Sequence, residues 1–354
     1  MKVLGIETSC DECAAAVVED GSLVLSNVVA TQIPWHAAYN GVVPEIASRM
    51  HTEWIGGVVK EALDRPGLEP AGVDGVAATA HPGLLGSLLV GLNFAKAFAW
   101  ARRIPFIAVD HMLAHLYAPR LLPAPVSGAQ NPPADTAPDY PFLGLLVSGG
   151  HSIICRADGF DDITVLGTTI DDAAGEAFDK VSKHYGFGYP GGAAIDRLAQ
   201  KGDPAAFRFP LPNLYKGDHP YDVSYSGLKT AVINQLEQFR AKPRPAAADE
   251  EAAGIAASFQ KTAVEILLRA LFRAAEDTGI STVVAGGGVA ANSFLRAKLA
   301  GRRDLRCVFP PPELCGDNGA MVAGLGFQYL ARGDISPLNA SASARIKAFK
   351  RRYP

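Results

Sequence analysis

The stretch Val3-Leu-Gly-Ile-Glu7, followed by Thr8-Ser-Cys-Asp-Glu12, opens the chain and has a counterpart in its second half. The first five residues predict a short strand, and the next five predict a turn. Apolar residues at 14–18 and 23–29 extend this opening to three short strands. The stretch Phe142-Leu-Gly-Leu-Leu-Val-Ser148 begins the same series again, with Gly149-Gly150 at its turn. The repeated opening predicts a duplicated α/β protein.

Helical and strand patterns follow each opening and predict two lobes with a central cleft. The predicted helices lie at about 47–64, 88–103, 172–185, 192–200 and 254–278, with strands at 75–79, 104–109 and 282–285. Lobe I is expected at 1–120 plus a C-terminal helix at about 317–335, and lobe II at 141–316.

Composition limits the partners and the compartment. The chain has 354 residues, 48% of them hydrophobic, which is enough for two domain cores. Its formal charge of −3 means that a nucleic acid would have to bind a local basic patch. Five cysteines, an odd number, favour a reducing compartment. Without a signal peptide or an apolar run of membrane-spanning length, the sequence predicts a cytoplasmic protein with no membrane partner.

Three segments have compositions typical of loops or tails. The Pro/Ala-rich stretch 121–140 predicts a solvated insertion without an assigned function, and 242–251 predicts a second loop. The basic tail 341–354 interleaves cations with aromatic residues. Among the local clusters of cations in the sequence, it is the best candidate for contacts with RNA. A solvated end with no role is the alternative. The cations of the tail are Arg345, Lys347, Lys350, Arg351 and Arg352.

His111 and His115 are the candidate metal ligands with the clearest spacing. An i, i+4 pair on a helix presents both imidazoles to one ion. Met112 stands where a His-Glu-x-x-His protease has its glutamate, which argues against that activity. Asp317, at the start of an apolar helix predicted for 318–330, is a candidate third ligand, with ordinary N-capping as the alternative. Two imidazoles and a carboxylate leave coordination positions open for a substrate.

Three turns rich in glycine and hydroxyl residues follow core strands, at 7–11, 147–151 and 286–292. Backbone N–H groups at such turns bind phosphate, and Asn292 is a candidate side-chain partner for a base or ribose. A glycine turn is more often only a turn. The three turns together indicate a nucleotide-binding site.

Several segments together resemble the bacterial TsaD (YgjD/Gcp) family, from residue 1 to about 335. The resemblance implies an actin/Hsp70/sugar-kinase-like (ASKHA) fold. The implied reaction moves the threonylcarbamoyl group of L-threonylcarbamoyl-AMP to N6 of adenosine 37 in tRNAs that read codons beginning with A (t6A modification), and releases AMP. The segments are Gly5-Ile-Glu-Thr-Ser-Cys-Asp-Glu12, Val43-Pro-Glu-Ile-Ala-Ser-Arg49, His111-Met-Leu-Ala-His115, Val147-Ser-Gly-Gly-His151, Asp171-Asp-Ala-Ala-Gly-Glu-Ala-Phe-Asp-Lys180, Tyr189-Pro-Gly-Gly192, Gly286-Gly-Gly-Val-Ala-Ala-Asn292 and Cys315-Gly-Asp-Asn-Gly319.

The resemblance also implies a site. It places one divalent metal ion, Fe2+ or alternatively Zn2+, on His111, His115 and Asp317. It places Leu146, Val147, Ser148, Gly149 and Gly150 along the substrate's phosphate and acyl region. It assigns the ribose and adenine to Asp179, Gly192, Asp196 and Asn292. For Asp179, a surface charge paired with Lys180 or Lys183 is the alternative. Cys13 departs from the family pattern, and we interpret the resulting Cys10-x-x-Cys13 pair as chance.

The chemistry and the partners complete the expectation. Threonylcarbamoyl-AMP is already activated, so no covalent nucleophile is needed, whereas N6 of adenosine is a poor nucleophile and a general base is plausible. Glu12 and Asp11 are the candidates, and the sequence does not choose between them. The resemblance implies the anticodon loop of tRNA, an inactive paralogue (TsaB) and a P-loop ATPase (TsaE) as partners. An ASKHA-fold small-molecule kinase or O-carbamoyltransferase, a nucleotide-binding scaffold and, weakest, a protease are the alternatives.

Overall fold

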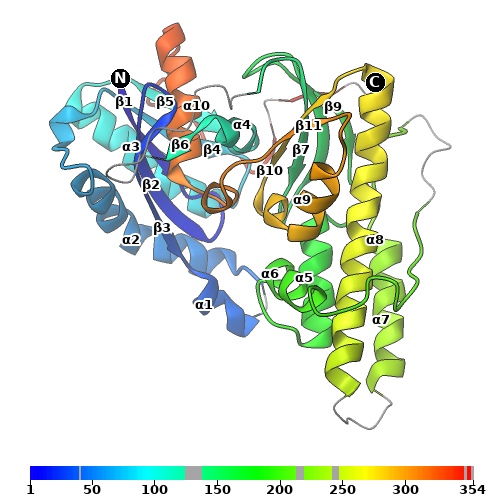
Figure 1. Ribbon diagram of the computed structural model, residues 1–354. Helices are drawn as coiled ribbons and strands as arrows, with labels where there is room; N and C mark the ends of the chain where they lie inside the picture. Colours follow the sequence, from blue (N-terminus) through cyan, green and yellow to red (C-terminus); the bar gives the residue numbers. More distant parts are fainter. Residues whose placement is uncertain (40, 124–137, 213–218, 241–246, 347–348, 352–354) are drawn as a thin grey trace, which may run out of the picture. The chain divides into compact units, whose positions relative to one another are not determined.

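The computed structural model divides the chain into two compact units (Figure 1). Unit 1 comprises residues 1–138, 159–163 and 310–349, and unit 2 comprises 139–158, 164–309 and 350–354. None of the helices described is long and apolar enough to cross a membrane. The residues that the structure describes are 1–39, 41–123, 138–212, 219–240, 247–346 and 349–351.

Unit 1 is built on a six-stranded sheet with the order β5-β4-β1-β2-β3-β6. The pairs β1–β2 and β2–β3 are antiparallel, whereas β1–β4 and β4–β5 are parallel. The strands are β1 (Lys2–Glu7), β2 (Glu12–Glu19), β3 (Leu23–Thr31), β4 (Gly75–His81), β5 (Phe106–Asp110) and β6 (Leu122–Pro123). The α-helices are α1 (Ile33–His36), α2 (Pro44–Asp64), α3 (Leu85–Arg102), α4 (His111–Tyr117) and α10 (Gly319–Arg332).

Helices cover both faces of β1, which is why this strand is almost wholly apolar. Leu4 and Ile6 point into a core shared with α2 and α3. Gly5, on the other face, allows α10 to approach closely, because an added Cβ would lie 2.2 Å from the carbonyl oxygen of Gly319. Successive residues of a strand point to opposite faces, so the two layers of helix bury the strand from Val3 to Glu7.

Unit 2 repeats this arrangement with the strand order β11-β10-β7-β8-β9-β12. Its first hairpin, β7–β8, is antiparallel, and β7–β10 and β10–β11 are parallel, as in unit 1. The strands are β7 (Phe142–Val147), β8 (Ser152–Ala157), β9 (Ile163–Thr168), β10 (Thr282–Gly286), β11 (Arg306–Val308) and β12 (Lys350–Arg351). The α-helices are α5 (Ala174–Tyr185), α6 (Gly191–Ala199), α7 (Ser226–Arg240), α8 (Ala247–Thr278) and α9 (Ser293–Ala300).

Two segments differ from the sequence-based expectation. The loop predicted at 242–251 is wrong from Ala247 onward, where α8 begins, because alanines and the acidic first turn favour a helix start. Its residues 242–246 lie outside the described residues, as do 124–137 of the insertion. Helix α7 was not predicted. Its sequence is mostly polar, so its apolar face, which includes the buried residues Leu228 and Val232, gives only a weak helical pattern.

Candidate functional site

Helix α4 carries the two histidines and begins where β5 ends. The carboxylate of Asp110 caps the helix, because one oxygen accepts hydrogen bonds from the N–H groups of Met112 and Leu113 at 2.8 and 3.1 Å. The imidazoles of His111 and His115 lie on the same side of the helix, with ring centroids 4.6 Å apart. Asp110 thus fixes the position from which both rings project.

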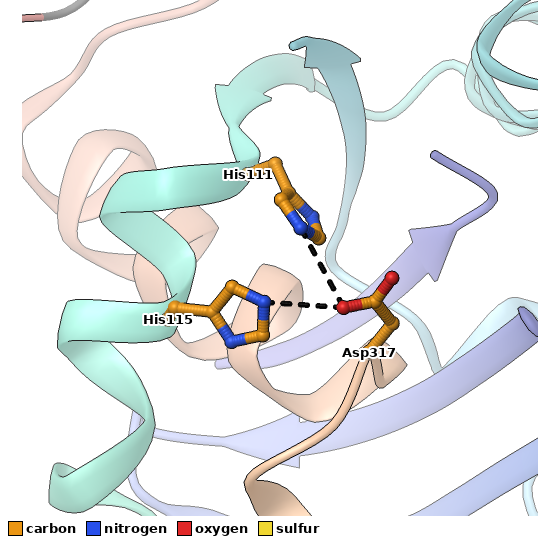
Figure 2. A group of neighbouring side chains, drawn as sticks. All are labelled: His111, His115 and Asp317. Atoms are coloured by element: carbon orange, nitrogen blue, oxygen red, sulfur yellow. Dashed lines mark hydrogen bonds and ion pairs between the residues drawn. The ribbon is translucent and has the colours of Figure 1, made fainter. Parts of the chain in front are cut away.

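The structure brings Asp317 to this pair (Figure 2). Its Oδ1 lies 3.1 Å from Nε2 of His115 and 3.5 Å from Nε2 of His111. The candidate donor atoms of the three residues all lie within 4.8 Å of one another. A tetrahedral ion about 2.0–2.1 Å from each ligand holds its donor atoms roughly 3.3 Å apart. The spacing therefore suits a divalent ion, and a donor set of two histidines and a carboxylate suits Fe2+ or Zn2+.

Asp317 does not cap the helix that follows it. The N-cap of α10 is Asn318, whose Oδ1 accepts a hydrogen bond from the N–H of Met321 at 2.9 Å. Its amide group also donates to the carbonyl oxygens of Leu314 and Gly316, which holds the preceding loop in place. The capping alternative for Asp317 is therefore wrong, and its carboxylate faces the two histidines instead.

Glu7, at the end of β1, is a site residue that the sequence reasoning missed. Its side chain is fully buried, and Oε2 lies 3.1 Å from Nδ1 of His111. The Ser9 N–H and the Thr79 hydroxyl also donate to this carboxylate. This contact favours a proton on Nδ1 of His111 and turns Nε2 toward Asp317, as carboxylates do behind metal-binding histidines. A glutamate ending an otherwise apolar strand was the available signal, because a buried carboxylate needs a partner.

The two histidines differ in how they are held. Nδ1 of His115 is buried and has no hydrogen-bond partner among the described residues, whereas Nδ1 of His111 faces Glu7. Burial lowers the pKa of His111, but Asp317 and Glu7 outweigh it and raise the pKa to about 9. Burial likewise raises the pKa of Glu7, but His111 lowers it below its ordinary value overall. His111 is thus protonated in the metal-free protein at neutral pH, and a metal ion must displace that proton.

The turn between β1 and β2 places both candidate bases, Asp11 and Glu12, near the candidate metal ligands. Asp11 is buried, and Glu12 begins β2, where its carboxylate accepts a hydrogen bond from the Thr31 hydroxyl at 3.3 Å. Burial, together with the charges of Asp317 and Asp11, raises the pKa of Glu12 to about 9. In the metal-free protein Glu12 therefore holds a proton at pH 7.

A buried chain of hydrogen bonds lies behind this turn, and the sequence reasoning missed it. His51 bonds the carbonyl oxygen of Cys10 through Nε2 at 2.9 Å, and Gln32 lies 3.5 Å from its Nδ1. Gln32 Oε1 in turn lies 3.2 Å from Nε2 of His36. All three side chains are fully buried. The chain ties α1 and α2 to the turn that carries Asp11.

In unit 2 the hairpin between β7 and β8 forms the predicted glycine turn. Leu146 and Val147 are buried in β7, and Ser148 is half-buried. Ser148 stabilises the turn, because its hydroxyl accepts a hydrogen bond from the His151 N–H at 3.2 Å. Gly149 and Gly150 are exposed, and an added Cβ on either would meet no protein atom within 4 Å. Their backbone is therefore open to a ligand.

Two further segments approach this hairpin. A Cβ on Gly175, in the first turn of α5, would lie 2.6 Å from the carbonyl oxygen of Ser148. Gly287 has φ +90°, and a Cβ there would lie 2.4 Å from the carbonyl oxygen of Val147. Glycine at these two positions thus lets the N-terminus of α5 and the 286–292 turn meet the hairpin. A helix N-terminus beside an open glycine turn is suited to an anion.

The other predicted substrate residues fall into two groups, Asn292 with Asp196 and Asp179 with Gly192. Asn292 donates from its amide to Asp196 at 3.3 Å and to Gln260 at 2.9 Å, while its Oδ1 caps α9. The amide of Asn292 is thus already bonded within the protein, and Asp196 is the less buried of the two side chains. Asp179 accepts a hydrogen bond from the Gly191 N–H at 2.7 Å, beside Gly192.

The acidic pair Asp171 and Asp172 lies just before α5, whose start was predicted at about 172. Helix α5 begins at Ala174, so Asp171 and Asp172 do not open it. Asp171 instead accepts hydrogen bonds at the start of α7, from the N–H of Tyr225 at 2.8 Å and the N–H of Ser226 at 3.3 Å. Asp172 forms ion pairs with Lys180 and Lys229. Lys180 also pairs with Glu176.

Solved structures with a similar fold place the chain in the ASKHA class, as expected. The structure of full-length HypF in its phosphate- and nucleotide-bound form matches with a TM-score of 0.56 and 15% identity, over 95% of this chain and 56% of that one. Component A of (R)-2-hydroxyglutaryl-CoA dehydratase from Acidaminococcus fermentans matches with a TM-score of 0.52 and 14% identity, over 94% and 99% of the two chains. At such identities the likeness shows the fold alone.

Sequence relatives identify the family. The family model "TsaD: tRNA N6-adenosine threonylcarbamoyltransferase" matches residues 23–324. The tRNA N6-adenosine threonylcarbamoyltransferase of Treponema denticola is 60% identical, over 99% of both chains. The protein of the same name from Borreliella burgdorferi (strain ZS7) is 49% identical, over 100% of this chain and 96% of its own. The chain therefore belongs to the TsaD family of tRNA N6-adenosine threonylcarbamoyltransferases.

Proposed function

We propose that this protein transfers the threonylcarbamoyl group of L-threonylcarbamoyl-AMP to N6 of adenosine 37 in tRNAs that read codons beginning with A, and releases AMP. The observation that carries the proposal is the 60% identity to the Treponema denticola enzyme over 99% of both chains. The close approach of His111, His115 and Asp317 supports it from the geometry, because the donors come from a helix and a loop far apart in sequence.

The metal centre belongs to unit 1. His111, His115 and Asp317 are the proposed ligands, with Fe2+ as the first assignment and Zn2+ as the second. When bound, a divalent ion supplies Lewis-acid polarisation of substrate oxygen atoms. Glu7 orients the imidazole of His111, and Asp110 fixes the start of the helix that carries both histidines.

Unit 2 supplies the proposed site for the donor. The backbone N–H groups of Gly149 and Gly150 bind the phosphate of threonylcarbamoyl-AMP, with the N-terminus of α5 adding its positive end. Leu146, Val147 and Ser148 shape the turn around the phosphate and acyl region. Asp179, Gly192, Asp196 and Asn292 hold the ribose and adenine, because carboxylates and amides match a ribose diol and a base edge.

Proton removal from N6 is assigned to the first turn of unit 1. Glu12 is protonated in the metal-free protein, so it acts as a base only after losing that proton. Asp317 would share its negative charge with a bound cation, which would weaken the effect that raises the pKa of Glu12. Asp11 is the second candidate, and replacement of each carboxylate by its amide separates the two roles.

The proposal includes partners and a compartment. The anticodon loop of tRNA presents adenosine 37 as a base that can be splayed into a pocket. An inactive paralogue (TsaB) and a P-loop ATPase (TsaE) are proposed partners on the family resemblance. We place the reaction in the cytoplasm, where its tRNA substrate is made, and the five free cysteines suit a reducing compartment.

Nucleoside analysis tests the proposed reaction directly. The purified chain is loaded with Fe2+ and incubated with threonylcarbamoyl-AMP, the two partner proteins and a tRNA transcript carrying adenosine 37. We expect N6-threonylcarbamoyladenosine by mass spectrometry, and none from a matched transcript with guanosine 37. If the Treponema denticola enzyme modifies the same transcript while this chain with its partners does not, the proposal is wrong. A phosphorylated or carbamoylated small molecule formed in its place would favour the kinase or O-carbamoyltransferase alternative.

A further inference from the structure

Helix α9 and strand β11 form a basic segment, 294–308, at one edge of the unit 2 sheet. Asp304 is its only acidic residue, and five cations give it a formal charge of +4 within a chain of net charge −3. β11 is the last strand at this edge of the sheet. The cations are Arg296, Lys298, Arg302, Arg303 and Arg306.

Aromatic rings support several of these cations without neutralising them. The guanidinium of Arg296 lies 4.6 Å from the ring centroid of Phe309, and Nζ of Lys298 lies 5.2 Å from that of Phe294. Such contacts hold a cation in place and do not change its charge. Lys298, Arg303 and Arg306 are exposed.

Arg302 pairs with the acidic residue of this segment. This guanidinium forms an ion pair with Asp304 at 2.6 Å and lies 4.0 Å from the ring centroid of Phe272. The hydrogen bond to Asp304 raises the pKa of Arg302, and the negative charge of Glu276 also contributes. The charge of Arg302 is therefore already paired within the protein.

The basic segment starts beside the proposed donor site. Helix α9 begins at Ser293, directly after Asn292, and the Ser293 N–H and hydroxyl both donate to Asp196. Arg296 is tied back to the same turn, because its Nε donates to the carbonyl oxygen of Ala290 at 2.8 Å. A polyanion on the basic segment would thus lie next to the residues assigned to the donor's nucleoside.

We propose that the basic segment 294–308 binds backbone phosphates of the tRNA substrate next to the donor site, an inference that rests on the proposed function. Exposed cations beside a nucleotide site fit the dense, repeated charge of RNA. The basic tail offers a competing surface, because its residues Lys350–Arg351 form β12 at the opposite edge of the same sheet. Cations can also protect an edge strand such as β11 from pairing with other chains, with no ligand involved.

A salt series separates these possibilities. The test variant is Lys298→Ala/Arg303→Ala/Arg306→Ala, and the matched control removes three exposed cations elsewhere in unit 2, Lys201→Ala/Arg208→Ala/Arg269→Ala. Each phosphate contact contributes about 0.7–0.9 to the slope of log affinity against log salt. We expect the test variant to lower the magnitude of that slope for tRNA by roughly two to three. We also expect a Kd at least tenfold higher at physiological salt and no change for the control.

Two further readings complete the test. Metal content and AMP affinity should match the wild type in both variants, which shows that the fold and donor site are intact. An unchanged slope in the test variant overturns the inference, and a lost slope on deletion of 343–354 would then assign the RNA surface to the tail. Wild-type protein that binds tRNA with the expected slope but forms no modified nucleoside would refute the proposed reaction and leave this surface standing.

Discussion

The first hairpin turn of unit 1 and that of unit 2 occupy the same place in two sheets of the same strand order, yet their chemistry is opposite. The β1–β2 turn carries Glu7, Asp11 and Glu12, three carboxylates held in or near the protein interior. The β7–β8 turn carries Gly149 and Gly150, exposed and without side chains. Duplication thus repeats the fold, while the two turns differ in chemistry: the unit 1 turn carries carboxylates beside the proposed metal ligands, and the unit 2 turn has an open backbone proposed to bind an anion.

The largest expected effect is the loss of metal affinity when a metal ligand is removed. His111→Ala or His115→Ala removes one of three protein donors, so metal affinity should fall by about 100-fold or more, beyond the range typical of outer-sphere changes. Elemental analysis after dialysis checks this, with His184→Ala, an exposed histidine of unit 2, as the control. Stoichiometric metal in either ligand variant would contradict the assignment.

A side chain on the unit 2 turn should abolish transfer without unfolding the protein. A Cβ added at Gly150 would meet no protein atom within 4 Å outside its chain neighbours, so Gly150→Val should keep the fold and the metal content. The valine would occupy the space that the phosphate needs. Transfer assays and thermal melts of the same preparation measure both effects. Normal transfer would show that the hairpin is only a turn.

Glu7→Gln tests whether the carboxylate of unit 1 acts through His111. The amide keeps the shape but loses the charge, and loss of such a partner typically lowers metal affinity 10–100-fold. Competition with a chelator of known affinity measures the change. Thr79→Val removes a neighbouring hydrogen bond to the same carboxylate but keeps its charge, and it should have a smaller effect. Wild-type affinity in Glu7→Gln would remove Glu7 from the site.

The pKa of His111 predicts opposite pH dependences with and without metal. Asp317 and Glu7 raise it to about 9, above the ordinary value of 6.5. In the metal-free protein the stabilisation from these ion pairs is complete below pH 6.5 and is lost as the pH rises through about 9. Metal affinity should instead increase with pH up to about 9, because metal replaces the proton. Thermal melts and metal titrations between these values test both signs, and parallel trends would be inconsistent with proton competition.

The smallest expected effect separates Asp317 from the residue after it. Asn318→Ala removes the N-cap of α10 and the two bonds from its amide to the loop before it, so it should destabilise the protein by about 1 kcal/mol or more and lower metal affinity less than Asp317→Asn does. Asp317→Asn should show the reverse, because it removes a charged ligand and leaves the cap. Chemical unfolding and elemental analysis of the two variants provide the comparison. Equal loss of stability and metal in both would favour a common structural role.

Local sequence patterns predicted the repeated fold and identified the candidate metal ligands. The i, i+4 spacing of His111 and His115 is itself a helical relation, and the two hairpins follow from short apolar runs ended by turns. Glu7 behind His111 could not be predicted as easily, because the contact spans 104 residues and depends on how β1 meets α4. The same holds for His51 and the Cys10 carbonyl. Asn318, rather than Asp317, caps α10 because the helix starts one residue later than its apolar pattern suggests.

The central claim, that unit 1 binds a metal ion beside its first turn and the unit 2 turn binds the nucleotide, is tested most directly by measuring both ligands on the same two variants. Metal content and AMP affinity are determined for His115→Ala and Gly150→Val beside the wild type. We predict that His115→Ala loses metal and still binds AMP, whereas Gly150→Val keeps metal and loses AMP. Wild-type AMP affinity in Gly150→Val, or full metal content in His115→Ala, would contradict the account.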